Sequence, residues 1–194
     1  MIKFTSNILP PKPYFAVSGG VDSMGGLSFL TRGKNRISGV VTINHRTNFG
    51  AQAEKLVVKY CEDHDIPCHT HSVTGSSEEE WREARKAIFA QYPAVITAHH
   101  LDDVVEWWLL TSLRGNGRLT PSSSGNVYHP FLKTRKSDFE YWCAKYQVPF
   151  INDPTNFGVS EGEGGNDRAK LRVLMPSLLG IYPGIHASIL KKLG

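Results

Sequence analysis

The feature that most constrains the fold of this chain is a short apolar run that ends in a glycine turn. Residues 14–17 are Tyr-Phe-Ala-Val, and apolar residues at helical spacing begin at residue 24. Between them stands one hexapeptide, Ser18-Gly19-Gly20-Val21-Asp22-Ser23. Glycine permits a tight turn there, and the helix that follows begins with unpaired backbone N–H groups. This order predicts a strand, a turn and a helix N-terminus that attracts an anion such as phosphate.

The alternation of strand and helix continues along the chain. Further strands are expected at 39–44, 67–73 and 94–98, and helices at 51–64, 78–92 and 101–113. Elements that alternate in this way predict a parallel sheet with both faces covered. The expected fold class is therefore α/β, an open parallel sheet of about five strands with helices on both faces. Ligands of such sheets bind beyond the carboxyl ends of the strands.

The regular alternation of strand and helix patterns ends after residue 114. Residues 115–125 are rich in Gly, Ser and Pro, which predicts a loop. Beyond the loop we expect an extended piece at 127–131, a helix at 136–146, a last strand at 149–151 and a short basic helix at 167–174. Residues 1–13 are expected to form an extended lead-in to a single domain at 14–194, with 115–194 as its C-terminal elaboration.

Composition narrows the class of protein. The 194 residues include 22 basic and 18 acidic side chains, a mild excess that permits an RNA partner without requiring one. Three cysteines without a CxxC spacing argue against a disulfide framework or a zinc knuckle. No run approaches the ~20 apolar residues that a membrane helix needs, and the N-terminus has no signal-peptide pattern. We therefore expect a cytoplasmic protein with no membrane partner.

Asp22 is the unusual member of the hexapeptide because a carboxylate repels phosphate. Its expected use is to hold Mg²⁺ against a polyphosphate. The loop lacks the Gly-Lys-Ser/Thr sequence with which a Walker A loop steadies the β- and γ-phosphates. It resembles instead the PP-loop of the ATP pyrophosphatases. That resemblance implies that the outer two phosphates of ATP are gripped as a leaving group, so that AMP is transferred rather than phosphate.

A second motif follows the strand expected at 94–98. It reads Thr97-Ala98-His99-His100-Leu101-Asp102-Asp103-Val104-Val105-Glu106. Asp102 and Asp103 precede Glu106 by four and three residues, so the three acids fall on one face of a helix. Three acids at the ligand-binding end of a strand are costly unless they meet a cation. That cation is either Mg²⁺ or an ammonium group.

Together these motifs resemble the tRNA(Ile)-lysidine synthetase family, from about Phe15 to Leu179. The resemblance includes the hexapeptide, Ile43-Asn44-His45, and the acidic motif with its tail Leu113-Arg114-Gly115. It also includes His129-Pro130-Phe131, similar to the family's Arg-Pro-Leu, and Asp153-Pro154-Thr155-Asn156, similar to its Asp-Pro-Ser-Asn. Finally, Asp167-Arg168-Ala169-Lys170-Leu171-Arg172 with Met175-Pro176 is similar to its Arg-Asn-x-x-Arg and terminal proline.

The resemblance implies a two-step ligase reaction with ATP and Mg²⁺. ATP adenylates the C2 carbonyl of a wobble cytidine in tRNA, and the ε-amine of free L-lysine then displaces AMP to give lysidine. The implied catalytic residues are Asp22, His99, Asp102, Asp103, Glu106 and Arg114. The implied ATP-binding residues are Ser18, Gly19, Gly20, Val21, Asp22, Ser23 and His45, with Asp22 holding the metal.

Physical chemistry gives several of these residues a role. A carboxylate cluster can hold a lysine ammonium group, and one acid can accept its proton. Arg114 is expected to steady charge on the α-phosphate. The residues expected to contact tRNA phosphates are Lys133, Arg135, Arg168 and Arg172. A homodimer is compatible with the sequence.

Some positions depart from the family pattern and leave alternatives open. Arg46 stands where a glycine is usual, Trp107 and Trp108 replace smaller residues, and His129 replaces an arginine. One alternative is another PP-loop adenylating enzyme that forms an amide or transfers sulfur. The sulfur version normally needs an active cysteine or a CxxC pair near the site, a pattern that Cys61, Cys68 and Cys143 do not show. The other alternative is a nucleotide- or RNA-binding protein without turnover.

Overall fold

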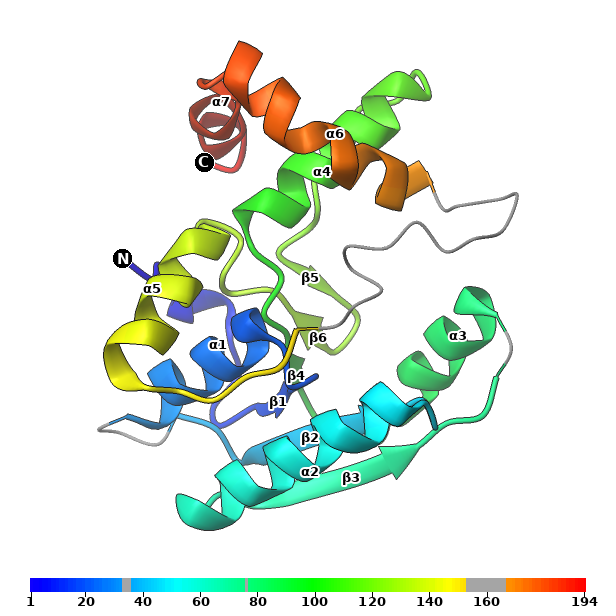
Figure 1. The fold of residues 1–194 in the computed structure, drawn as a ribbon, viewed down its shortest axis with the longest axis vertical. Helices are drawn as coiled ribbons and strands as arrows, with labels where there is room; N and C mark the ends of the chain where they lie inside the picture. The colour runs from blue at the N-terminus through cyan, green and yellow to red at the C-terminus, as the bar shows by residue number, and fades with distance from the viewer. Residues whose placement is uncertain (33–35, 76, 153–166) are drawn as a thin grey trace.

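A six-stranded sheet, five of whose strands run parallel, forms the centre of the molecule (Figure 1). The computed structural model describes residues 1–32, 36–75, 77–152 and 167–194. The strands stand in the order β3-β2-β1-β4-β6-β5. Their bounds are β1 Tyr14–Ala16, β2 Gly39–Asn44, β3 Cys68–Ser72, β4 Val95–Ile96, β5 Ser123–Ser124 and β6 Val127–Tyr128. Only β5 is antiparallel to its neighbour.

The strand order reverses between β1 and β4. The chain leaves β1 toward β2 and β3 on one side, and β4 returns to the other side of β1. Tyr14 consequently pairs with Gly39 of β2 and with Val95 of β4. Such a switch point opens a crevice at the carboxyl ends of the two central strands, which is where α/β sheets bind ligands.

Helices cover both faces of the sheet. Their bounds are α1 Val21–Thr31, α2 Asn48–Asp63, α3 Glu78–Phe89, α4 Leu101–Leu113, α5 Lys136–Tyr146, α6 Asp167–Ile181 and α7 Ile185–Lys192, with a 3₁₀ turn η1 at Ser6–Ile8. Phe15 of β1 packs in a core with residues of α1, α2 and α5. Its neighbours Tyr14 and Ala16 point the other way, toward residues of α3. The alternation of side chains along β1 thus separates two apolar layers.

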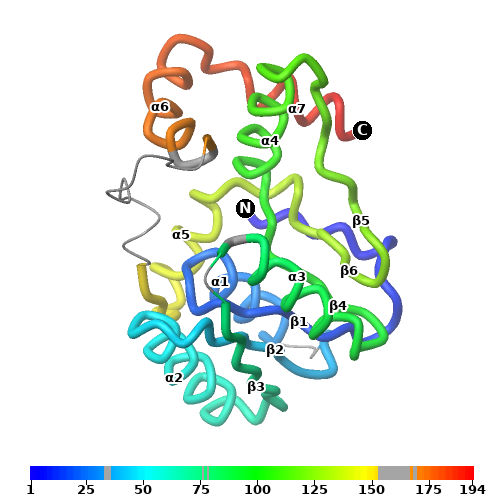
Figure 2. The backbone as a smooth tube through the Cα atoms, turned by 90° about the vertical axis from the view of Figure 1, so that its right-hand side faces the viewer, coloured from blue at the N-terminus to red at the C-terminus, as the bar shows by residue number. Residues whose placement is uncertain are grey.

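A third apolar cluster joins α4, α6 and α7. Leu101, Val104 and Val105 of α4 are fully buried against Met175 of α6 and Ile189 of α7. Figures 1 and 2 show these helices together at one end of the molecule, away from α2 and β3. Helix α4 therefore begins at the sheet and extends into a separate helical layer.

The α/β class and the parallel sheet are confirmed. Strand 39–44 and the helices at 101–113 and 136–146 have the predicted bounds. The strand predicted at 149–151 is wrong, because this segment pairs with no strand; the Ile151 N–H donates instead to the Gly19 carbonyl at 3.0 Å. The fifth parallel strand is β6, and the predicted loop at 115–125 contains β5.

The helix predicted at 167–174 extends to Ile181, and α7 was not predicted. Pro176 lies inside α6 and removes one backbone donor. Leu171 and Met175 hold the helix together across this position because they are buried against α4. Tertiary packing here outweighs a local signal for termination.

No single helix in the described parts of the chain is long and apolar enough to cross a membrane, and one bent pair, α6 with α7, meets that test by length and composition only.

Valine in place of Gly26 should destabilise the fold. A Cβ at Gly26 would lie 2.9 Å from Cζ of Phe15, a ring that is fully buried. We expect Gly26→Val to lower the free energy of unfolding by about 2 kcal/mol or more, as overpacking does. Gly180→Val is the matched control, because nothing lies within 4 Å of a Cβ there. Equal urea midpoints for the two variants would contradict this packing.

Candidate active site

A cleft of about 670 Å³ opens at the switch point between β1 and β4. Its floor is made by the ends of β1, β2, β4 and β6, and the hexapeptide forms one wall through Ser18, Asp22 and Ser23. The other walls are made by α3, the start of α4 and Arg172 of α6. The cleft therefore collects residues that are far apart in the sequence, as the strand order predicts.

The hexapeptide leaves the N-terminus of α1 open. Gly20 is the N-cap and no side chain caps the helix. Ser23 Oγ is used locally: it donates to the Gly20 carbonyl at 3.0 Å and accepts from the Ser18 N–H at 3.2 Å. Gly19 has φ +81°, and a Cβ there would lie 3.1 Å from Cβ of Ala53, so this position requires glycine. The uncapped helix end can accept an anion.

Three carboxylates surround the buried ring of His100. Its Nε2 lies 3.5 Å from Oδ1 of Asp22, and its Nδ1 lies 3.7 Å from Oδ2 of Asp102 and 3.5 Å from Oδ2 of Asp103. Burial lowers the pKa of His100, but Asp103, Asp22 and Asp102 outweigh it and raise the pKa to about 9. The Asp103 N–H donates to Nδ1 at 3.4 Å, a long and therefore weak hydrogen bond beside these carboxylates.

Asp102 is committed to structural partners. Its Oδ2 accepts from the Lys136 N–H at the start of α5 at 2.8 Å, and its Oδ1 lies 2.9 Å from Nε2 of His186 in α7. Burial opposes ionisation, yet the Lys136 N–H, His100 and His186 keep the pKa of Asp102 below its usual range. Asp102 is not among the residues that line the cleft. It links the site to α5 and α7 instead.

Glu106 and Arg172 form an ion pair beside the cleft. Nε of Arg172 donates to both carboxylate oxygens of Glu106, at 3.1 and 3.0 Å. Nη2 of the same guanidinium lies 4.0 Å from Oδ1 of Asp103. Arg172 and Asp103 line the cleft, whereas Glu106 stands behind them. From the sequence, Arg172 was expected to contact tRNA. In the structure, the described contacts of the Arg172 side chain are with Glu106 and Asp103.

The structure does not bring Arg114 to the cleft. Arg114 is the C-cap of α4, about 20 Å along the helix from His100 at 1.5 Å per residue. Its guanidinium is exposed and forms an ion pair with Asp167. This position does not fit the expected contact with an α-phosphate. The tail of the acidic motif therefore lies in the helical layer of α4 and α6.

The expected tRNA contacts are scattered. Lys133 donates to the Gly194 carbonyl, and Arg135 reaches Nδ1 of His186 at 3.4 Å. Arg168 falls in α6, but its side chain lies outside the described residues, as does the motif at 153–156. These assignments stay predictions.

The sequence analysis missed the basic wall that α3 presents to the cleft. Arg82, Arg85, Lys86 and Phe89 all line it. They stand at i, i+3, i+4 and i+7, so a helical wheel would have placed them on one face. Arg82 and Lys86 also pair with Glu79 and Glu83 on their own helix.

His45 faces this basic wall. It lines the cleft, and its Nδ1 is buried without a hydrogen-bond partner among the described residues. Burial and the positive charge of Arg85 lower the pKa of His45. The ring centroid lies 5.2 Å from that of Trp81. A neutral imidazole is thus available to a ligand in the cleft.

His99 and His129 share the remaining wall with Thr97. Thr97 Oγ1 lies 2.7 Å from Nδ1 of each ring. Burial, followed by repulsion from His99, lowers the pKa of His129 to about 4, against a smaller opposite effect of Asp103. His129 is therefore neutral at pH 7.

Asp22 is the residue that fits Mg²⁺. Its Oδ1 is buried and forms no hydrogen bond within the described chain, and the nearest described cation is the His100 ring, whose Nε2 lies 3.5 Å away. Magnesium commonly takes one or two carboxylates and completes its shell with phosphate oxygens and water. Across the described residues, no three His, Cys, Asp or Glu side chains converge as a metal site. Asp22 could therefore hold the ion only together with phosphate oxygens and water molecules.

A model of the PP-loop domain matches residues 3–176. The chain belongs to the PP-loop domain family. This assignment agrees with the open loop before α1, and the family is one that uses ATP.

Several curated relatives are called tRNA(Ile)-lysidine synthase. The relative from Streptococcus pyogenes serotype M3 is 33% identical over 142 residues, which cover 63% of this chain and 33% of that protein. The relative from Orientia tsutsugamushi is 28% identical, covering 75% and 38%, and that from Aster yellows witches'-broom phytoplasma is 33% identical, covering 73% and 36%. The resemblance that the motifs indicated is confirmed. This chain spans about a third of the length of these relatives.

The fold is also found among solved structures. The U34-tRNA thiolase NcsA from Methanococcus maripaludis, with its [4Fe-4S] cluster, superposes with a TM-score of 0.71 and covers 98% of this chain and 74% of that one. Its sequence identity is 17%, so this likeness concerns the fold alone.

The charged His100 makes stability depend on pH. Because its pKa rises from 6.5 to about 9 on folding, its contribution is fully present below pH 6.5 and is lost as pH rises through 9. The full shift corresponds to about 3 kcal/mol. We expect thermal unfolding without nucleotide to show this loss, and His100→Gln to flatten the curve in that window. His69→Gln, at an exposed position of β3, should leave the slope unchanged; a steep slope in His100→Gln would contradict the assignment.

Proposed function

We propose that this PP-loop domain binds ATP in the cleft and transfers AMP to a carbonyl oxygen, releasing pyrophosphate. The carbonyl is that of a wobble cytidine in tRNA, and the ε-amine of free L-lysine then replaces AMP. The names of the relatives support the substrates. Because the chain spans only part of those proteins, substrate and reaction are inferred from the cleft as well.

One observation carries the proposal. The uncapped start of α1 lies beside the buried Oδ1 of Asp22, which forms no hydrogen bond within the described chain and faces only the His100 ring at 3.5 Å. The helix end favours an anion, and the carboxylate favours a cation. A polyphosphate with its divalent ion satisfies both demands at once. No neutral ligand would do so.

The cleft residues divide the reaction between them. Bound ATP would supply the adenylyl group that turns a carbonyl oxygen into a leaving group. The backbone N–H groups at Gly20 and Val21 would bind the outer phosphates, and Asp22 would hold Mg²⁺ there. Asp22 would thereby balance the charge of departing pyrophosphate. His45 would contact the nucleotide from the end of β2.

Other residues of the cleft suit an amine and a nucleic acid. Asp103 lines the cleft with a carboxylate that can attract a lysine ammonium group. Glu106 would act through Arg172, which it orients. Arg82, Arg85 and Lys86 of α3 would contact anionic groups of the substrates, phosphates of tRNA included. Lys133, Arg135 and Arg168 remain our proposal for an outer tRNA surface.

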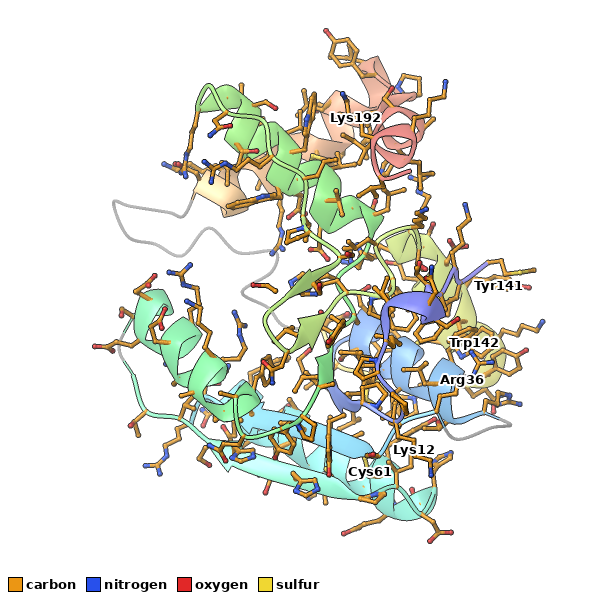
Figure 3. All side chains as sticks on the ribbon, turned by 180° about the vertical axis from the view of Figure 1, so that it is seen from behind. Lys12, Arg36, Cys61, Tyr141, Trp142 and Lys192 are labelled. Carbon is orange, nitrogen blue, oxygen red and sulfur yellow. The ribbon has the colours of Figure 1, made fainter. Side chains whose placement is uncertain are left out.

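The cysteines argue against the sulfur-transfer alternative. None of the three lines the cleft. Cys61 lies near Cys68, which begins β3 at the amino end of the sheet, and Figure 3 shows Cys61 in that part of the molecule. Cys143 is buried behind α1, where burial and the Asp22 carboxylate raise the pKa of its thiol to about 11. No thiol is therefore placed to carry sulfur to a substrate.

Pyrophosphate release decides between the candidate functions. We expect the protein, incubated with labelled ATP and Mg²⁺, to release pyrophosphate only with a tRNA transcript, and to release AMP and form lysidine only when lysine is added as well. ADP and orthophosphate as products would refute the proposal. Product formation with another amine or a sulfur donor, but not with lysine, would favour the alternative PP-loop enzymes. Tight ATP or RNA binding without AMP would favour the non-catalytic reading.

Removing one charge from the loop should stop the first step. We expect Asp22→Asn to slow pyrophosphate release by at least about 100-fold, because a ligand of the charged leaving group is lost. Asp63→Asn is the control, since Asp63 is exposed on α2 and pairs with Lys59. Urea unfolding of both variants would exclude a loss of folded protein. Full activity in Asp22→Asn would remove the proposed role of this carboxylate.

A further inference from the structure

Trp107 of α4 differs from the other tryptophans of the chain. The indoles of Trp81 and Trp142 each lie against another aromatic ring and donate a hydrogen bond, and Trp108 packs on the apolar cluster of α4, α6 and α7. The side chain of Trp107 is 38% exposed, and its indole has no hydrogen bond or ring contact with another described residue. A large aromatic ring in this position is available to a ligand.

Trp107 stands one helical turn beyond the cleft. Asp103 lines the cleft, and Trp107 follows it by four residues, so the two side chains share one face of α4. Side chains of a helix lean toward its N-terminus, and this direction takes the indole toward the turn of Asp103. Trp107 itself is not among the residues that line the cleft. It therefore lies just outside, where a substrate longer than the cleft would extend.

Positive charge adjoins this stretch of α4. Arg118 is exposed, and its backbone N–H donates to Oγ1 of Thr111 at 2.8 Å, which holds it against the helix about one turn past Trp107. Arg114 is also exposed and lies on the face of Trp107, seven residues further on, although Asp167 balances its charge in part. An aromatic ring followed by guanidinium groups is a composition that suits single-stranded nucleic acid.

The surroundings of Trp107 favour RNA over a protein partner. An apolar docking surface needs several adjoining exposed side chains. On α4, however, Leu110 beside Trp107 is buried, and the exposed Leu113 points about a third of a turn away. Bases inside a duplex are already stacked, so an indole takes up an unpaired base. The partner that fits is thus a single-stranded RNA loop.

We propose that Trp107 stacks on an unpaired RNA base next to the base held in the cleft, and that Arg118 contacts a phosphate beyond it. This inference rests on the proposed function for the presence of an RNA base in the cleft. The step from Asp103 to Trp107 is about 6 Å along α4, a distance that one nucleotide of an unstacked strand spans. Stacking tolerates any base, so Trp107 adds affinity and holds the loop in register while the cleft selects the reacting base.

RNA binding without ATP tests this contact directly. The probe is an RNA hairpin with a cytidine in its single-stranded loop and the fluorescent base 2-aminopurine beside it, before the cytidine in one version and after it in another. We expect the native protein to quench one version. Trp107→Ala should abolish the quenching and raise the Kd about tenfold, as the loss of one stacked base does. Trp107→Phe, which keeps a smaller ring, should lie between the two.

Tyr141→Ala is the matched control, because Tyr141 is a 65% exposed aromatic residue of α5 and lies away from α4 (Figure 3). Its Kd should equal the native value, and urea midpoints show that each variant is folded. Equal Kd values for the native protein and Trp107→Ala would overturn the proposal, as would a duplex whose binding depends equally on Trp107. A native dimer that dissociates in Trp107→Ala, with unchanged RNA affinity, would do the same, since the ring would then cover a second copy of the chain.

Turnover separates this inference from the proposed function. We expect Trp107→Ala to raise the KM for tRNA in pyrophosphate release about tenfold, with kcat and the KM for ATP unchanged, because the stacked base is not the reacting one. A native KM for tRNA in this variant would refute the stacking contact and leave the proposed function intact. Hairpin binding that depends on Trp107, without release of pyrophosphate, would support the contact and count against the proposed reaction.

Discussion

The buried charge of His100 is the interaction on which this site depends. An imidazolium with little access to water is stable here because Asp22, Asp102 and Asp103 surround it, and each carboxylate in turn avoids repulsion from the others. The three acids belong to α1 and α4, so the ion joins the loop at the end of β1 to the helix that follows β4. Through Asp102 the same cluster reaches α5 and α7. The two sides of the switch point are thereby fixed to each other, and the cleft between them has a defined width.

The cleft is bipolar, which explains why one motif alone could not define its function. Carboxylates occupy the wall near α1 and α4, and the cations of α3 stand across from them. Such a division suits a reaction that handles a polyphosphate, a cationic amine and a nucleic acid together. It also places two neutral imidazoles, His45 and His129, in a site otherwise full of charge. Burial keeps these rings neutral, so they can serve as acceptors or as contacts for a base.

Much of the fold followed from local patterns, and the site followed less completely. The glycine turn before α1 and the apolar period of 101–113 are local signals, so the strands, the loop and α4 could be predicted. The different partners of Asp102, Asp103 and Glu106 could not be predicted. Helical spacing places all three acids on one face, but it does not say which side chains pack against each of them. Arg114 was misplaced for a similar reason: nearness in sequence to the acids hid a full helix length between them. The α3 cations were visible as a helical face, but only the sheet order shows that this face meets the loop.

The cleft also has a consequence for how the protein gains its rigidity. Its walls come from the loop before α1, the end of β2, helix α3, the start of α4 and Arg172 of α6, so no two neighbouring elements make the site alone. A ligand bound in the cleft contacts residues from nearly the whole length of the chain. Its binding free energy is added to the global unfolding transition, not to one local segment. Saturating ligand should therefore slow amide hydrogen exchange across the sheet as well as around the loop. Exchange protection can thus report whether the cleft is occupied, even by a compound that the protein does not turn over.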